Sequence, residues 1–121
     1  MDTIKTLVIE PLRRPELRDI DPTITAIGET IGGYAEPLPL DRRTTLWCDE
    51  EGAIKNLKPN RTIRLSQDSR LADAGKPIII RGTFVITGPH PQDGPLGLDD
   101  EQIGRYAAMF ADPEAPCRLP D

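Results

Sequence analysis

The sequence has little of what several specialised classes of protein require. It contains one Trp, two Tyr and two Phe, and its 15 basic residues are outnumbered by 20 acidic residues, which gives a net charge of -5. An acidic chain argues against non-specific binding to nucleic acid, because phosphate contacts need a basic surface. No apolar run approaches the roughly 20 residues that cross a bilayer, and the N-terminus lacks the basic-then-apolar pattern of a signal peptide. We therefore expect a cytoplasmic protein with no membrane partner.

Cysteine and histidine are too scarce to build the usual metal sites. Cys48 and Cys117 form no Cys-x-x-Cys pair, and His90 is the single histidine. A zinc site would need ligands that the sequence does not supply, so we expect no metal and no cofactor. Cys48 lies in an apolar run, which favours a buried side chain over a nucleophile. His90 lies between two prolines without an obvious nucleophile in the sequence, so we expect no catalytic residue.

Apolar, β-branched runs predict most of the strands. Residues 4–9, 44–48 and 77–87 have this composition, which suits the half-buried surface of a sheet. Residues 12–20 and 34–40 contain prolines, which confine a strand to the edge of a sheet. We therefore expect three main strands and at most two edge strands.

Two glycines predict local breaks along these segments. Gly52 ends a turn after the strand at 44–48, so we expect a hairpin with its return arm at 53–55 and an ordered turn at 56–61. Gly82 interrupts the longest apolar run. A glycine in the interior of a strand often marks a bulge, so we expect one at this position.

Two helices are predicted from their end signals and their apolar spacing. The Asp-Pro pair at 21–22 suits the start of the first helix, and the Gly-Gly pair at 32–33 suits its end. Between them, isoleucines recur three and four residues apart and share one stripe. Asp99, with Gln102 three residues later, predicts a capping box that opens the second helix.

Together these elements predict an α+β fold. It would have a small mixed or antiparallel sheet with two helices packed on one face. Residues 1–111 would form a single domain, and residues 112–121 would form a Pro-rich C-terminal tail. No internal repeat is visible in the sequence.

Three motifs could contact a ligand, although each also has a purely structural interpretation. The turn with Asn56 and Asn60 is expected to be rigid, because Asn tolerates left-handed backbone and bonds its own main chain. Arg residues in and after this turn offer planar donor forks suited to phosphate or carboxylate. The Gly-Gly-Tyr sequence at 32–34 would let a ligand approach closely, but two glycines after a helix more often only cap it. The predicted ligand-binding residues are Gly33, Tyr34, Trp47, Asn56, Asn60, Arg61, Arg64 and Arg81.

The order of several short motifs resembles that of a known family. These motifs are Ile-Gly-Gly-Tyr at 31–34, Trp-Cys-Asp-Glu-Glu-Gly at 47–52, Leu-Lys-Pro-Asn-Arg at 57–61, Ile-Arg-Gly-Thr-Phe-Val-Ile at 80–86 and Leu-Asp-Asp-Glu at 98–101. Over about residues 4–111 the chain resembles domain-of-unknown-function family 3846, found in phages and their bacterial hosts. The resemblance implies a phage or prophage setting, where short accessory proteins counter host defence and some sequester nucleotide immune signals.

Three functions are compatible with these observations. The first is a non-catalytic phage protein, expected to be a homo-oligomer, that binds a small anionic, nucleotide-like ligand and so acts as a sponge for an immune signal. The second is an inhibitor that binds a host protein through an acidic face with residues 49–51 and 99–101. The third, which we rank last, is a phosphodiesterase that would use His90, Glu51 and Arg61.

Overall fold

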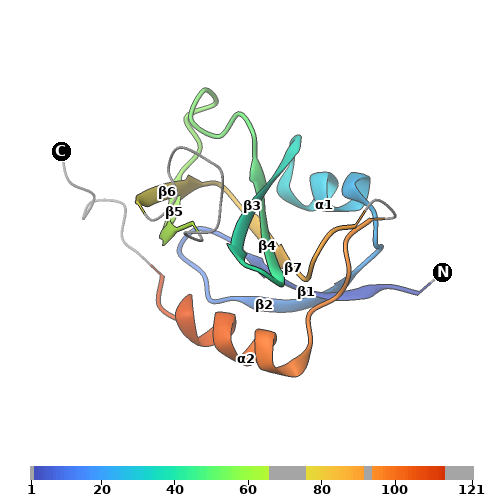
Figure 1. Cartoon of the computed structure of the whole chain (residues 1–121). Helices are drawn as coiled ribbons and strands as arrows, with labels where there is room; N and C mark the ends of the chain where they lie inside the picture. The colour runs from blue at the N-terminus through green and yellow to red at the C-terminus, as the bar shows by residue number, and fades with distance from the viewer. Residues whose placement is uncertain (1, 66–75, 92–93, 114–121) are drawn as a thin grey trace.

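The computed structural model describes residues 2–65, 76–91 and 94–113, and its described part contains two helices and two antiparallel sheets (Figure 1). In chain order the elements are β1 (Ile4–Ile9), β2 (Glu16–Ile20), α1 (Ile24–Ile31), β3 (Ala35–Asp41), β4 (Thr44–Asp49), β5 (Pro59–Arg64), β6 (Pro77–Arg81), β7 (Phe84–Thr87) and α2 (Asp100–Met109). The larger sheet has the strand order β2-β1-β7-β4-β3, and the smaller sheet pairs β5 with β6. The predicted α+β class is confirmed. Beyond residue 113, the predicted tail and Cys117 lie outside the described residues.

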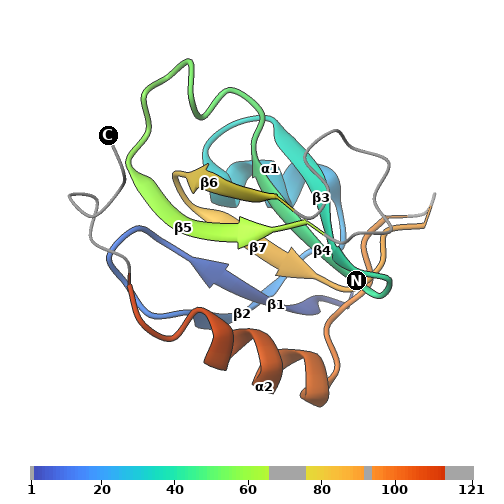
Figure 2. The same ribbon diagram turned by 60° about the vertical axis from the view of Figure 1, so that its left-hand side comes forward.

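The apolar side chains of β1 alternate between the two faces of the larger sheet. Leu7 belongs to the same core cluster as Tyr106 of α2. Its neighbour Val8 belongs to a second cluster with Ile27 of α1. The two helices therefore cover opposite faces, as Figures 1 and 2 also show. The prediction that both helices pack on one face is wrong, because the inner strands are apolar on both faces and each face needs a cover.

Both edge strands of the larger sheet lie in segments that contain proline. β2 and β3 are its two edge strands, which confirms the prediction for residues 12–20 and 34–40. β4 pairs with β3 and β7, so the return arm predicted at 53–55 is wrong. Those residues form turns instead, in which the Lys55 amide donates to Glu51 and the Leu57 amide donates to Gly52.

The smaller sheet was not expected from the sequence pattern. β5 begins at Pro59, so the predicted turn at 56–61 is wrong for its second half. The run at 77–87 is split between the two sheets, because Gly82 adopts a φ of 80° and turns the chain. The predicted bulge is therefore a corner between β6 and β7. Ile63 and Ile80 of the small sheet join the core cluster that α2 also contacts.

The ends of both helices follow capping rules. Thr23, rather than Asp21, caps α1 and accepts from the Ala26 amide at 3.0 Å. The predicted capping box of α2 is confirmed: the Gln102 amide donates to Asp99 at 2.8 Å, and the Asp99 amide donates to the Gln102 side chain at 2.9 Å. Neither helix of the described chain is long and apolar enough to cross a membrane.

Candidate functional site

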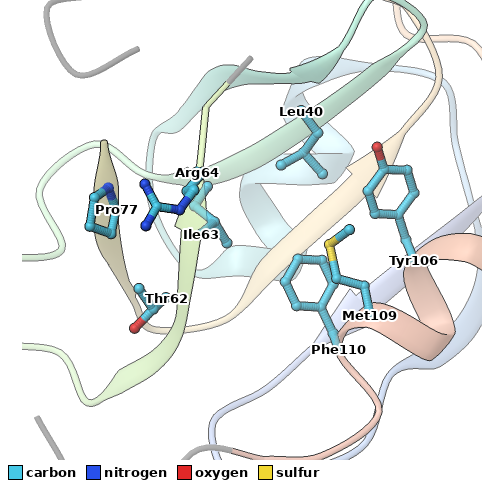
Figure 3. A pocket seen from close by; sticks show the side chains of 8 residues that line it. All are labelled: Leu40, Thr62, Ile63, Arg64, Pro77, Tyr106, Met109 and Phe110. Atoms are coloured by element: carbon cyan, nitrogen blue, oxygen red, sulfur yellow. The ribbon is translucent and has the colours of Figure 1, made fainter. Parts of the chain in front are cut away.

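A pocket lies between the smaller sheet and α2. Its volume is about 420 Å³, which is within the usual range for small-molecule sites. β5 supplies one wall, and α2 with its C-cap residue supplies the other (Figure 3). The lining residues are Leu40, Thr62, Ile63, Arg64, Pro77, Tyr106, Met109 and Phe110. Most of this lining is apolar, so the pocket suits a ligand with an apolar or aromatic part.

The polar groups of the pocket lie at its two ends. Figure 3 shows the Arg64 guanidinium at one end and the Tyr106 hydroxyl at the other, with apolar side chains between them. The Tyr106 hydroxyl donates a hydrogen bond to the Asp41 carboxylate. The Thr44 and Arg105 side chains also lie within hydrogen-bonding reach of the same hydroxyl. The pocket thus has a cationic donor at one end and a neutral hydroxyl at the other, separated by apolar surface.

Burial and a neighbouring carboxylate fix the protonation state of Tyr106. Burial, followed by the hydrogen bond to Asp41, raises the pKa of the Tyr106 hydroxyl to about 12. Burial alone would raise the pKa of Asp41, but the hydrogen bonds from Tyr106 and the Arg43 amide outweigh it and lower that pKa. Near neutral pH, Tyr106 is therefore a neutral donor to an ionised carboxylate.

Arg61, a predicted ligand-binding residue, is buried and serves the structure. Its side chain is among the most enclosed in the described chain, with 1% exposure. The guanidinium donates to Asn60 Oδ1 and to the backbone carbonyls of Arg13 and Phe110, each at 2.8 Å. These contacts hold the C-terminal end of α2 against β5 and against the connection between β1 and β2. Arg61 thereby fixes the position of one pocket wall.

Four other predicted residues are placed by structural contacts. Asn60 is 1% exposed and donates to two backbone carbonyls, one on β1 and one at the corner before β7. Trp47 is buried, and its indole N–H donates to the Thr87 hydroxyl on the neighbouring strand at 2.9 Å. Arg81 donates to a backbone carbonyl of the β4–β5 connection at 3.1 Å. Asn56 is exposed and adopts a φ of 56°, so it shapes a turn.

Gly33 and Tyr34 line a second hollow, on the face that α1 covers. It lies between α1 and the start of β3 and has a volume of about 470 Å³. Tyr34 is 76% exposed. The structure therefore separates Gly33 and Tyr34 from Arg61 and Arg64, which lie on the side of α2.

An ion pair between buried Asp49 and exposed Lys55 explains why residue 33 is glycine. The Asp49 side chain is 1% exposed, and its Oδ2 lies 2.8 Å from the Lys55 ammonium. A Cβ atom at Gly33 would lie 2.4 Å from that oxygen. The Glu51 amide donates to the other Asp49 oxygen at 2.8 Å. The carboxylate therefore holds the turn after β4 against the end of α1.

We expect Asp49 to make folding stability depend on pH. Burial alone would raise its pKa, but the hydrogen bonds from Lys55 and the Glu51 amide outweigh burial and lower the pKa below 3.8. A lowered pKa stabilises the fold above the unfolded-state value, and this contribution is lost as the pH falls through the folded-state value. Asp49→Asn should therefore cost about 1–2 kcal/mol near neutral pH and progressively less in acid.

Urea denaturation of wild type and Asp49→Asn at about pH 7 and about pH 3 measures the difference in their free energies of unfolding. Glu50→Gln removes a charge from an exposed neighbour in the same turn and should leave the pH dependence unchanged. A gap between wild type and Asp49→Asn that stays constant with pH would show that the carboxylate is not linked to folding.

The acidic residues of the predicted interaction face do not form one surface. Asp49 is buried against Lys55, while Asp99 caps α2 and pairs with Arg43. Figures 1 and 2 show the connection after β4 on the opposite side of the molecule from α2. The two acidic segments therefore lie far apart, and each is partly neutralised.

The three residues of the phosphodiesterase hypothesis also lie apart. The His90 ring packs against the edge of Trp47 at 5.0 Å, and Trp47 belongs to the core cluster on the α1 face. Arg61 is buried on the α2 face. Glu51 is exposed in the turn after β4. Within residues 2–65, 76–91 and 94–113, no three His, Cys, Asp or Glu side chains gather where they could hold a metal ion.

The motif order noted in the sequence corresponds to a defined family. A family model described as Domain of unknown function (DUF3846) matches residues 4–111. The chain belongs to the DUF3846 family. A comparison with curated proteins and another with solved structures gave no match. The DUF3846 match spans all the helices and strands described above.

Sequence patterns indicate little of the pocket in this DUF3846 protein. Among the predicted ligand-binding residues, Arg64 alone lines the pocket between β5 and α2. Tyr106 and Phe110 belong to the apolar stripe of α2, which predicts burial without predicting a cavity. Met109 lies outside that stripe and is 60% exposed. In the sequence, a Met that falls outside the apolar stripe of a helix is the one signal that could have pointed to this surface.

Proposed function

We propose that this DUF3846 protein is a non-catalytic binding protein for a small anionic, nucleotide-like molecule. The ligand would occupy the pocket between β5 and α2. The observation that carries the proposal is the arrangement of this pocket, which has a guanidinium at one end, a hydroxyl at the other and apolar side chains between.

The apolar middle of the pocket suits a flat, aromatic group. The Tyr106 and Phe110 rings are stacked, with centroids 6.4 Å apart and planes inclined by 20°. Met109 presents a flexible, polarisable side chain at the same wall, and such side chains make favourable contacts with aromatic rings. A nucleobase would gain from both, because stacking tolerates any base.

The two polar ends suit the two ends of a nucleotide. A guanidinium has five N–H donors, so Arg64 can bind a phosphate in addition to its contacts within the chain. At the other end, the neutral Tyr106 hydroxyl would lie beside the polar edge of a base. Thr62 lines the pocket at the Arg64 end.

Tight binding without turnover would sequester the ligand. Where the ligand is a nucleotide immune signal, the protein would act as a sponge, the counter-defence role that the family resemblance implies. The protein would then need to match the signal in concentration, because each pocket removes one molecule.

The proposal is tested by a binding panel of cyclic mononucleotides, cyclic dinucleotides and ADP-ribose. We expect at least one compound to raise the melting temperature, since a ligand at a hundredfold excess over its Kd adds about 2.7 kcal/mol of stability. Arg64→Met should weaken the same compound about 10- to 100-fold in isothermal titration, through loss of a charge-assisted hydrogen bond.

The matched control is Arg14→Met. Arg14 is exposed on the connection between β1 and β2 and does not line the pocket, so this variant removes the same charge elsewhere. It should bind as wild type does. A panel without a thermal shift, or binding that Arg64→Met leaves intact, would contradict the proposal.

A further inference from the structure

The two edges of the larger sheet differ in their capacity to accept another strand. β3 carries Pro37 and Pro39 at alternate positions, paired with Trp47 and Thr45 of β4. Proline is tolerated in an edge strand where its nitrogen faces away from the neighbouring strand. The outer edge of β3 therefore lacks two donors. β2 has no proline between Glu16 and Ile20.

One side-chain contact fixes the orientation of the β2 backbone. The Thr6 hydroxyl of β1 donates to the Arg18 carbonyl at 2.7 Å, so this carbonyl faces β1. Successive residues of an antiparallel strand turn their N–H and C=O groups to opposite edges. The backbone groups of Leu17 and Asp19 consequently face away from β1. Apart from its ladder with β1, β2 takes part in no backbone hydrogen bond with the rest of the described chain.

The side chains of β2 are complementary to their own copy. Arg18 Nε lies 2.8 Å from the Glu16 carboxylate, so the two opposite charges share one face of the strand. Leu17 is 51% exposed and lies between them on the other face, opposite Leu7 of β1. A second β2 strand, antiparallel and centred on Leu17, would place each Glu16 opposite the Arg18 of the other copy. Centring on Arg18 instead would place two arginines opposite each other, which is unfavourable.

We propose that β2 is a self-association edge at which a second copy of this chain pairs antiparallel about a two-fold axis at Leu17. The Leu17 backbone groups of the two copies exchange two hydrogen bonds, and the Asp19 amide of each copy donates to the Pro15 carbonyl of the other. The two Leu17 side chains meet on one face, and two Glu16–Arg18 pairs form on the other. The combined larger sheet then ends on both sides in a β3 strand with its prolines, so it does not grow by a further strand at either end.

Charge reversal tests the pairing of Glu16 with Arg18. We expect wild type to sediment as a dimer in equilibrium with monomer. Glu16→Arg replaces two attractive pairs by two repulsive ones and should raise the dissociation constant about tenfold or more. The double variant Glu16→Arg/Arg18→Glu exchanges the charges and should restore the dimer. Circular dichroism verifies that each variant folds.

Disulfide trapping tests the register. Cys117 is replaced by Ser throughout, and Cys48 remains inert because burial raises the pKa of its thiol to about 12. Leu17→Cys should form a disulfide-linked dimer on mild oxidation, since Cα atoms of a hydrogen-bonded antiparallel pair lie about 5.5 Å apart, within disulfide range. Asp19→Cys should not, because each residue 19 lies opposite residue 15 of the other copy.

Three outcomes would overturn the inference. Wild type that stays monomeric at its highest soluble concentration would show that the edge is not used. A dimer that Glu16→Arg leaves intact would place the interface elsewhere. Cross-linking of Arg18→Cys in preference to Leu17→Cys would refute the register. None of these readouts depends on the proposed ligand, so they are distinguishable from a failure of the binding panel.

Discussion

Arg61→Met is expected to lower the free energy of unfolding by about 3–4 kcal/mol. The guanidinium is buried and donates to Asn60 Oδ1 and to two backbone carbonyls, on Arg13 and Phe110. Met preserves the apolar stem but leaves these buried acceptors without their donor, which costs more than the hydrogen bonds contribute when formed. The positive charge also lies at the C-terminal end of α2, where a helix favours cations.

Arg64→Met is the matched control for this prediction. Arg64 lies three residues later on the same strand but is exposed, so its loss should change stability by less than about 0.5 kcal/mol. Urea denaturation followed by circular dichroism measures both variants. We therefore expect Arg61 to govern stability and Arg64 to govern ligand affinity. If Arg61→Met lowers the free energy of unfolding by less than about 1 kcal/mol, the hydrogen bonds of Arg61 do not hold α2 in place.

Phe84→Ala is expected to cost about 3–5 kcal/mol. Phe84 lies on the central strand of the larger sheet and has no exposed surface. Its ring meets the edge of the Phe110 ring, with centroids 5.5 Å apart and planes inclined by 79°. Truncation removes this contact and leaves a cavity under the end of α2, where the surrounding strands can relax only in part.

Met109→Ala and Phe84→Leu are the comparison variants for the loss of stability in Phe84→Ala. Met109 lies on the same helix end but is 60% exposed, so its truncation should cost less than about 1 kcal/mol. Phe84→Leu keeps much of the apolar volume and should fall between the two variants, and it provides a measurable protein should Phe84→Ala fail to fold. Thermal and urea unfolding give the order. Equal losses for Phe84→Ala and Met109→Ala would contradict the assignment of Phe84 to the core.

The sequence predicted those features that depend on residues close together in the chain. The capping box at Asp99 and Gln102 works through two hydrogen bonds three residues apart, so the sequence alone contains it. The end of α1 at Gly32 depends on one left-handed residue, with a φ of 87°. Pro37 and Pro39 likewise placed β3 at an edge, because a missing donor excludes a central position, and Pro15 precedes the other edge strand, β2.

The sequence analysis failed for features that depend on contacts between residues far apart in the chain. The guanidinium of Arg61 suits an anionic ligand, which is why the sequence suggested a binding role. In the structure it donates instead to the carbonyls of Arg13 and Phe110, which are 48 and 49 residues away in the chain. No pattern around Arg61 reveals that these carbonyls need a donor. Gly82 gave the correct position of a break but not its result, since a bulge and a corner use the same left-handed glycine. Which sheet receives the next strand depends on the core as a whole.

The pocket depends on the relative positions of four elements, β3, β5, β6 and α2. Leu40 comes from β3, Ile63 from β5 and Tyr106 from α2. Each of these residues has the sequence context of an ordinary core position. The cavity arises from the separation of the two-stranded sheet from α2, and apolar spacing within one element contains no information on that distance.

Under the proposed function, two arginines of β5 have separate roles, since Arg61 supports the fold and Arg64 would contact the ligand. Arg61 points inward and binds the end of α2, while Arg64 is exposed on the same strand and lines the edge of the pocket, with its guanidinium toward Pro77 (Figure 3). If the pocket binds a ligand as proposed, substitutions at Thr62, Arg64 and Met109 would change its specificity while the inner layers of the sheet stay unchanged. A different ligand specificity could then arise from a few surface changes without a change of fold.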